Sequence, residues 1–150
     1  AVSRLRESRD PSLHRLKRGT CLMDAMLEPV FSQALQRLAA TGHHVPHDNL
    51  ACALLLQPLM SGSSNLPLGK ALANSSTRFS NLRFSQLIAA QTPDELFTHL
   101  QRALRLLDGK ANPFDVARIA LEWTEHGADR VRKRLIANFY ALPDTGLQAA

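Results

Sequence analysis

Hydrophobic residues recur along this chain at the three- and four-residue spacing of amphipathic helices. The clearest segment begins at Thr92-Pro93-Asp94-Glu95, where threonine at the N-cap, proline at the first helical position and glutamate at the third form a helix-start signature. Its apolar positions share one helical face: Leu96, Leu100, Ala103, Leu104 and Leu107. Gly109 follows, where a left-handed residue commonly closes a helix. The sequence therefore predicts a helix between Thr92 and Gly109.

Two further segments toward the C-terminus carry the same signals. Asn112 and Pro113 open the first, whose apolar positions are Val116, Ile119, Ala120 and Trp123. The second runs from Ala128 to about Leu142, because Pro143 blocks continuation of a helix. Its apolar positions are also spaced helically: Val131, Leu135, Ile136 and Phe139. Both segments are predicted helices.

Proline also marks the helix starts that are predicted in the first half of the chain. One helix is expected from Pro29 to Ala40, and a mostly buried one from Pro46 to about Met60. Pro58 lies in the last turn of the second helix, where it should kink or end it. Two shorter helices are expected over 10–18 and 20–27.

Signals for β-strands are nearly absent. No run alternates apolar and polar residues with many valines, isoleucines and threonines, and Asp108-Gly109 joins two helical patterns rather than two strands. We therefore expect an all-α fold of about seven to nine helices. The flexible stretch 61–65 is expected to link an N-terminal helical lobe, 1–62, to a C-terminal helical lobe, 66–150, within one compact chain.

The composition is that of a folded globular domain. Of the 150 residues, 45% are hydrophobic and 21% are charged, which argues against a disordered tail. The longest apolar run, residues 50–56, is far shorter than the roughly 20 residues of a membrane span. The first eighteen residues are basic and contain no apolar segment typical of a secretory signal. We therefore expect a cytoplasmic protein without a membrane partner.

The net charge of +5 is distributed unevenly. Basic residues cluster in the first eighteen positions and again over 130–134, and no acidic residue lies between Asp48 and Asp94. If folding brings these clusters together, a polyanion is the natural partner. The alternative is that each cluster is an ordinary solvated helix face. Because only 5% of the residues are aromatic, nucleic acid would be bound through phosphate contacts rather than base stacking.

Motifs for catalysis or metal binding are missing. His43, His44, His47 and Cys52 lie close in the sequence, but their spacing fits no zinc-site template. Cys21 and Cys52 are expected to be small buried side chains in a reducing compartment. No nucleophile elbow and no glycine-rich phosphate loop occurs. We therefore expect neither an enzyme nor a protein with a metal or a cofactor.

Five segments in the second half occur in a distinctive order. They are Leu68-Gly69-Lys70-Ala71-Leu72-Ala73, Arg83-Phe84-Ser85-Gln86-Leu87-Ile88, the helix 100–107, Ala117-Arg118 to Trp123, and the terminal pair Phe139-Tyr140. In order and spacing they resemble the CasB family, the small subunit of the type I-E CRISPR Cascade complex. The first half resembles the family more loosely, through Leu13 to Arg18 and Val30 to Leu38.

This resemblance implies an all-α, two-lobed subunit that has no catalytic activity of its own. It implies a second copy packed head-to-tail, contacts with the backbone and large subunits of Cascade, and proximity to the CRISPR RNA. It further implies a basic surface that binds the target and displaced DNA strands and stabilises the R-loop in antiviral defence. The alternative is a scaffold subunit whose basic residues contact neighbouring proteins or the guide RNA.

Nine basic residues are the candidates for nucleic-acid binding. The resemblance assigns five of them through their motif positions: Arg15, Lys70, Arg78, Arg83 and Arg102. Charge and helical spacing alone add four more: Arg18, Arg105, Arg130 and Arg134.

Overall fold

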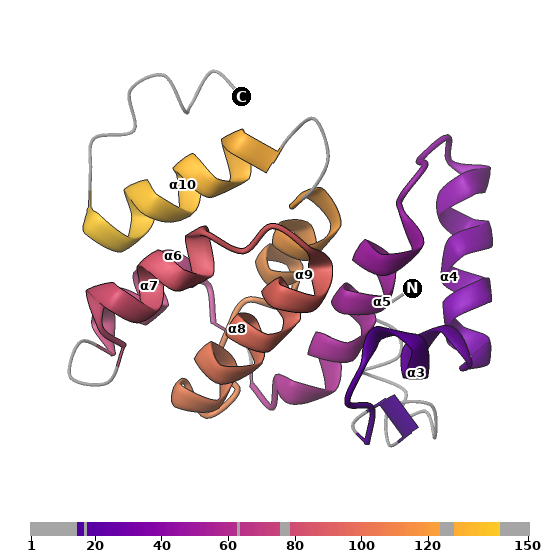
Figure 1. Ribbon diagram of the computed structural model, residues 1–150, viewed down its shortest axis with the longest axis horizontal. Helices are drawn as coiled ribbons and strands as arrows, with labels where there is room; N and C mark the ends of the chain where they lie inside the picture. The colour runs from indigo at the N-terminus through magenta and orange to yellow at the C-terminus, as the bar shows by residue number, and fades with distance from the viewer. Residues whose placement is uncertain (1–14, 17, 63, 76–78, 124–127, 142–150) are drawn as a thin grey trace.

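The computed structural model describes residues 15, 16, 18–62, 64–75, 79–123 and 128–141. Figure 1 shows that these residues form an all-α fold, which confirms the predicted fold class. Within the described part, the chain forms eight α-helices and one 3₁₀ helix but no strand, and an isolated β-bridge pairs Gly62 with Lys110. No helix in these ranges is long and apolar enough to cross a membrane.

The elements follow one another with short connections. Their bounds are α3 Leu22–Met26, α4 Pro29–Ala40, α5 His47–Leu56, η1 Gln57–Leu59, α6 Leu68–Asn74, α7 Asn81–Ile88, α8 Pro93–Leu106, α9 Pro113–Glu122 and α10 Ala128–Tyr140. The helix predicted from Pro29 to Ala40 is confirmed at both ends. The helix predicted to end near Met60 leaves α-helical geometry at Leu56 and continues as the 3₁₀ helix that contains Pro58. Most of the helix expected over 10–18 lies outside the described residues.

Helix α5 is the centre of the molecule. Every residue from Asn49 to Leu56 is buried, as expected of a helix that is apolar all round. It packs against α3, α4, α8 and α9. The buried Asn49 side chain donates a hydrogen bond to the Ala120 carbonyl at 2.9 Å, which satisfies its amide within the core. One hydrophobic core extends from Leu16 to Leu135, while the division into two lobes at 61–65 stays a prediction.

Side chains cap the helices where the sequence predicts. The Thr92 hydroxyl accepts a hydrogen bond from the Glu95 backbone N–H at 3.2 Å, and the Glu95 carboxylate accepts one from the Gln91 N–H at 2.8 Å. The Asn112 side chain likewise caps α9. Gly109 has φ +75°, which confirms the expected left-handed turn. These local contacts fix where α8 and α9 begin and end.

Helix α10 is held against both α6 and α7. On α6, a Cβ atom at Gly69 would lie 2.7 Å from the Leu135 carbonyl oxygen, so glycine permits the close approach of the two helices. On α7, the Phe84 ring stacks on Phe139 with centroids 3.9 Å apart and planes 6° apart. Two segments of the family pattern, the Leu-Gly-Lys motif and the terminal aromatic pair, therefore build the packing of α10.

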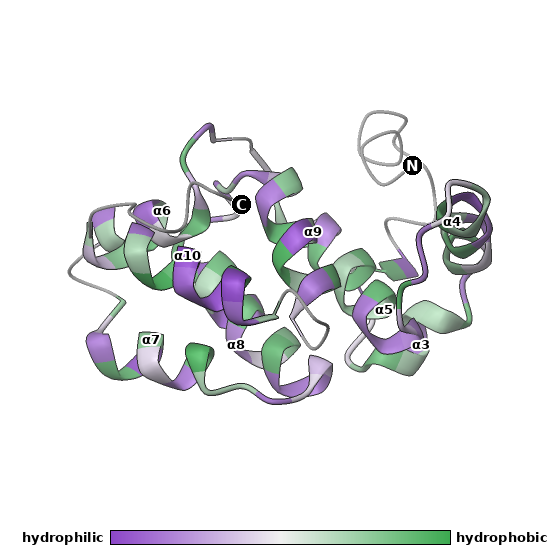
Figure 2. Ribbon diagram, turned by 90° about the horizontal axis from the view of Figure 1, so that it is seen from above, coloured by the Kyte–Doolittle hydropathy of each residue, from purple (hydrophilic) through white to green (hydrophobic). Residues whose placement is uncertain are grey.

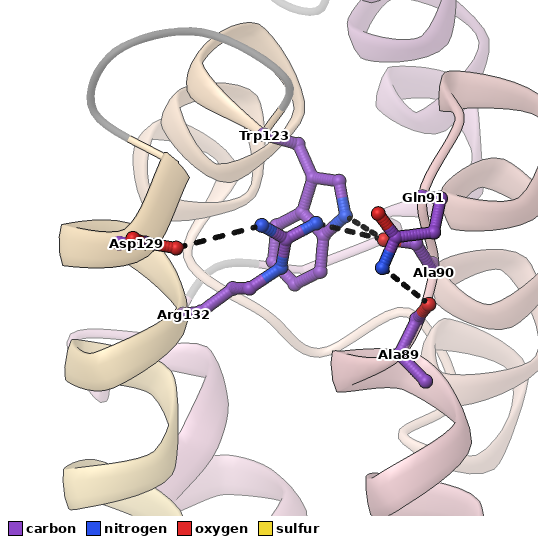
Figure 3. A network of polar contacts seen from close by, with 6 residues as sticks. All are labelled: Ala89, Ala90, Gln91, Trp123, Asp129 and Arg132. Atoms are coloured by element: carbon purple, nitrogen blue, oxygen red, sulfur yellow. Dashed lines mark hydrogen bonds and ion pairs between the residues drawn. The ribbon is translucent and has the colours of Figure 1, made fainter.

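A polar network ties α9 and α10 to the link between α7 and α8 (Figure 3). The fully buried Trp123 indole N–H donates to the Ala90 carbonyl at 2.8 Å, and an Arg132 Nη donates to the same oxygen at 2.9 Å. The Arg132 guanidinium lies 4.7 Å from the Trp123 ring centroid, and its other Nη is 3.9 Å from the Asp129 carboxylate. These contacts position the residues that join α7 to α8.

The two cysteines differ in exposure. Cys52 is buried in α5, and this burial, with a smaller effect from Asp94, raises the pKa of its thiol. Cys21 is exposed at the N-cap of α3, so the prediction that it is buried is wrong. It lies outside the core because Asp24 draws the chain into a turn. The carboxylate accepts hydrogen bonds from the Thr20 and Cys21 N–H groups, which lower the pKa of Asp24.

Candidate nucleic-acid interface

A cavity of about 390 Å³ opens between α7 and α8. We call it the arginine groove, and define it by the residues that line it: Phe79, Arg83, Gln86, His99, Arg102, Arg105 and Leu106. It brings together three of the nine predicted nucleic-acid-binding residues, Arg83, Arg102 and Arg105. No acidic side chain of the described residues lines it.

Helical spacing explains how two short segments supply this lining. Arg83 and Gln86 are three residues apart on α7, and His99, Arg102 and Arg105 follow at the same interval on α8. Residues three apart lie on one side of a helix. The core sides of the same helices carry fully buried apolar residues: Phe84, Leu87, Leu96, Leu100, Ala103 and Leu104. Burial of these residues orients the arginines toward the groove.

The charge of the groove favours an anion. Arg83 lies in the first turn of α7, where Ser80 caps the helix by accepting a hydrogen bond from the Arg83 backbone N–H at 3.2 Å. The positive end of the α7 dipole therefore adds to the charge of the guanidinium groups. A guanidinium offers several N–H donors in a plane that matches the oxygens of a phosphate. Three such groups lining one cavity can bind phosphate groups.

The other predicted residues on the α6 and α10 side lie outside this groove. Lys70 is exposed on α6 and Arg130 is exposed on α10. Arg134 is half-buried and lines a small hollow that Asp115 and Arg118 share. In Figure 2, α10 lies between α6 and α7. These three basic residues therefore belong to the surface around α10 rather than to the arginine groove.

The remaining predicted residues are not part of the groove either. Arg15 and Arg18 do not line the groove, and they precede α3, which lies at the opposite end of the molecule from α7 in Figure 1. The Arg15 Nε lies 2.6 Å from the Glu28 carboxylate, so a carboxylate compensates this charge. Arg78 lies outside the described residues.

The groove contains two polar residues that the sequence did not single out, Gln86 and His99. The available signal was their spacing, because each lies three residues from a predicted arginine on the same helix. Conversely, Arg132 belongs to the predicted basic cluster but has a structural role, since it is bonded to Ala90 and packed on Trp123. Arg118 forms an exposed ion pair with Glu122 at 3.7 Å.

A second cavity, of about 350 Å³, lies between α4, α5 and α9 and has a different character. Most of its lining is apolar, and Arg37 is its one charged side chain within the described residues. Two histidines of the loop before α5 interact with nearby side chains. His43 shares a 2.9 Å hydrogen bond with the Thr41 hydroxyl, and the His47 and Phe31 rings pack edge to face. Across the described ranges, no group of three potential metal ligands comes together.

Comparison with family models gives a match over residues 12–140 to the family described as CRISPR-associated protein Cse2. This chain belongs to the Cse2 family. CasB and Cse2 denote the same family, so the resemblance drawn from the motifs is confirmed. Membership identifies the chain as a CRISPR-associated protein and a Cascade subunit. Searches among curated proteins and among solved structures give no match. The matched region of this Cse2-family chain includes α7, α8 and the whole arginine groove.

Proposed function

We propose that this Cse2-family chain is the non-enzymatic small subunit of a Cascade complex, and that it stabilises the R-loop by binding the nucleic-acid backbone. The observation that carries the proposal is the arginine groove, in which three guanidinium groups line one cavity without an acidic neighbour in its lining. Membership of the Cse2 family supports the assignment to Cascade. The groove supplies a physical means of holding a strand in that complex.

R-loop formation is a reaction in which a small contribution from protein decides the outcome. In another class of RNA-guided complexes, the heteroduplex that forms is about as stable as the DNA duplex that it replaces. Lysine and arginine side chains that contact phosphates release counterions, so their binding does not depend on sequence and weakens as salt rises. A subunit that serves any target needs this kind of contact.

The partners in this proposal are the CRISPR RNA, the target and displaced DNA strands, the backbone and large subunits of Cascade, and a second copy of the chain packed head-to-tail. Among the nine predicted residues, we assign the principal phosphate contacts to the arginine groove. The basic residues around α10, Lys70 and Arg130, would extend the path of a strand, since both are exposed. Arg15 contributes less, because Glu28 already pairs with it.

Charge reversal in the assembled complex tests the proposal. The variant is Arg83→Glu with Arg102→Glu, and R-loop yield is measured over a range of salt concentrations. The matched control is Arg37→Glu with Lys110→Glu, because both residues are exposed, lie outside the arginine groove, are not among the nine candidates and change the charge equally. We expect the groove variant to lose R-loop yield and part of its dependence on salt, because fewer phosphate contacts release fewer counterions, while the control retains both.

Two results would count against this function. An R-loop yield that equals that of the unmodified complex at every salt concentration would refute a role of the groove in strand binding. Release of the small subunit, with normal R-loops in the complexes that retain it, would instead support the scaffold alternative. Both quantities are obtained from one preparation by measuring subunit occupancy beside R-loop yield.

A further inference from the structure

The arginine groove is a cavity with more than cationic residues in its wall. Gln86 on α7 and His99 on α8 supply polar hydrogen-bonding groups, and Leu106, with the small exposed part of the largely buried Phe79, supplies apolar surface. A surface that only neutralises phosphates needs exposed charges, and it needs neither uncharged polar groups nor apolar surface. The composition of the wall therefore points to a ligand that is partly anionic and partly flat and apolar.

We propose that the groove takes up the base of one unpaired nucleotide, while the arginines bind the phosphates beside it. This inference rests on the proposed function, because it names what the same site holds. The volume of about 390 Å³ falls within the range of roughly 300–1,000 Å³ that is usual for small-ligand pockets. In a duplex the bases are stacked and paired, so a base enters a cavity between two helices only when it is unpaired. The groove would thus distinguish single strands from duplex.

The polar residues of the groove suit any base rather than one. The Gln86 amide carries both donors and an acceptor, and a histidine ring such as that of His99 can be donor or acceptor according to its tautomer. Both groups can therefore satisfy bases with different hydrogen-bonding edges. Leu106, with the small exposed part of Phe79, would contact the apolar face that every base shares. The site would bind single strands in preference to duplex, whatever their sequence.

Binding of the isolated full-length chain to two single strands tests this proposal. One strand is oligothymidylate of about 12 nucleotides, within the site sizes of roughly 4–16 nucleotides that are common for such proteins. The other is an abasic strand with the same number of phosphates. We expect the abasic strand to bind about 5- to 10-fold more weakly in fluorescence anisotropy.

A variant pair locates the difference in the groove. Gln86→Ala should weaken binding of oligothymidylate about 3-fold and leave binding of the abasic strand unchanged, because the lost hydrogen bonds involve only the base. Gln36→Ala, an exposed glutamine on α4, is the matched control and should change neither. Both truncations are at exposed positions, so folding is retained.

The outcomes separate this inference from the proposed function. Equal affinity for the two strands, or an equal effect of Gln86→Ala on both, would overturn the base-binding site and leave phosphate binding intact. If neither strand binds, or if Arg83→Glu with Arg102→Glu leaves binding of both unchanged, the proposed function fails and this inference fails with it.

Discussion

Two regions of the molecule carry arginines on helices, the groove between α7 and α8 and the surface around α9 and α10. The arginines of the two regions differ in the residues that surround them. Arg83, Arg102 and Arg105 line a cavity with no acidic residue in its described wall. Around α9 and α10, Arg118 pairs with Glu122, whereas Arg132 bonds to Ala90 and packs on Trp123. In the proposed function the first set binds phosphates, whereas Arg118 and Arg132 of the second set interact with neighbouring groups of the protein.

The comparison of these two regions shows that a high local density of charge does not by itself identify a binding residue. The run 130–134 is the densest basic cluster that the structure describes, yet one of its members is mostly buried in a structural network, with a side chain that is 19% exposed. The α8 arginines are more dispersed, yet they converge because they lie three residues apart beside α7. The neighbours in space decide which role an arginine has.

The largest effect is expected on the α9 and α10 side. Trp123→Ala removes a fully buried ring and the hydrogen bond to Ala90, so the free energy of unfolding should fall by about 3–5 kcal/mol. Chemical denaturation measures this change. Trp123→Phe, which keeps an aromatic ring, should cost clearly less. An equal loss for both variants would show that the indole hydrogen bond, rather than packing, dominates.

The next effect concerns the arginine beside that ring. Arg132→Met keeps a long side chain but removes the hydrogen bond to Ala90 and the contact of charge with Trp123, so the free energy of unfolding should fall by about 1–3 kcal/mol. Binding of single-stranded DNA, measured well below the unfolding temperature, should change less than it does for Arg102→Met. A binding loss as large as that of Arg102→Met would end the distinction between the two regions.

The smallest effect is predicted for the exposed ion pair on α9. Arg118→Ala should lower the free energy of unfolding by only about 0.3–0.5 kcal/mol, since exposed pairs four residues apart on a helix contribute little. It should not alter affinity for single-stranded DNA, because Arg118 is outside the groove. A clear loss of affinity would extend the binding surface onto α9.

Much of the fold could be predicted because short-range chemistry fixes it. Thr92 and Asn112 cap the helices that they were expected to cap, and Gly109 takes the left-handed conformation. Contacts between distant residues could not be predicted in this way. The Asp115 carboxylate accepts a hydrogen bond from the Leu68 N–H at 2.7 Å and so ties α9 to α6 across 47 residues, and no local pattern encodes that pairing.

The candidate site could be predicted only in part, for the same reason. The family resemblance indicated Arg83 and Arg102, and charge with helical spacing added Arg105, which lines the same cavity. Phe84 of α7 packs on Phe139 of α10, and Trp123 and Arg132 bond to Ala90 in the link between α7 and α8. These contacts between residues far apart in the sequence hold α7 in place, and no local pattern encodes them. Spacing placed Gln86 and His99 on the same helix sides as the arginines, but only the structure shows that those two sides line one cavity.

Photo-crosslinking in the assembled Cascade complex tests whether a DNA strand lies in the arginine groove. Each DNA strand is made in turn with photoreactive thymidine analogues, the R-loop is formed, and crosslinked peptides of the small subunit are mapped by mass spectrometry. We expect crosslinks to peptides that contain α7 and the second half of α8, where the arginine groove lies. Crosslinks confined to the α3 and α4 end of the chain, or none from either strand, would contradict it.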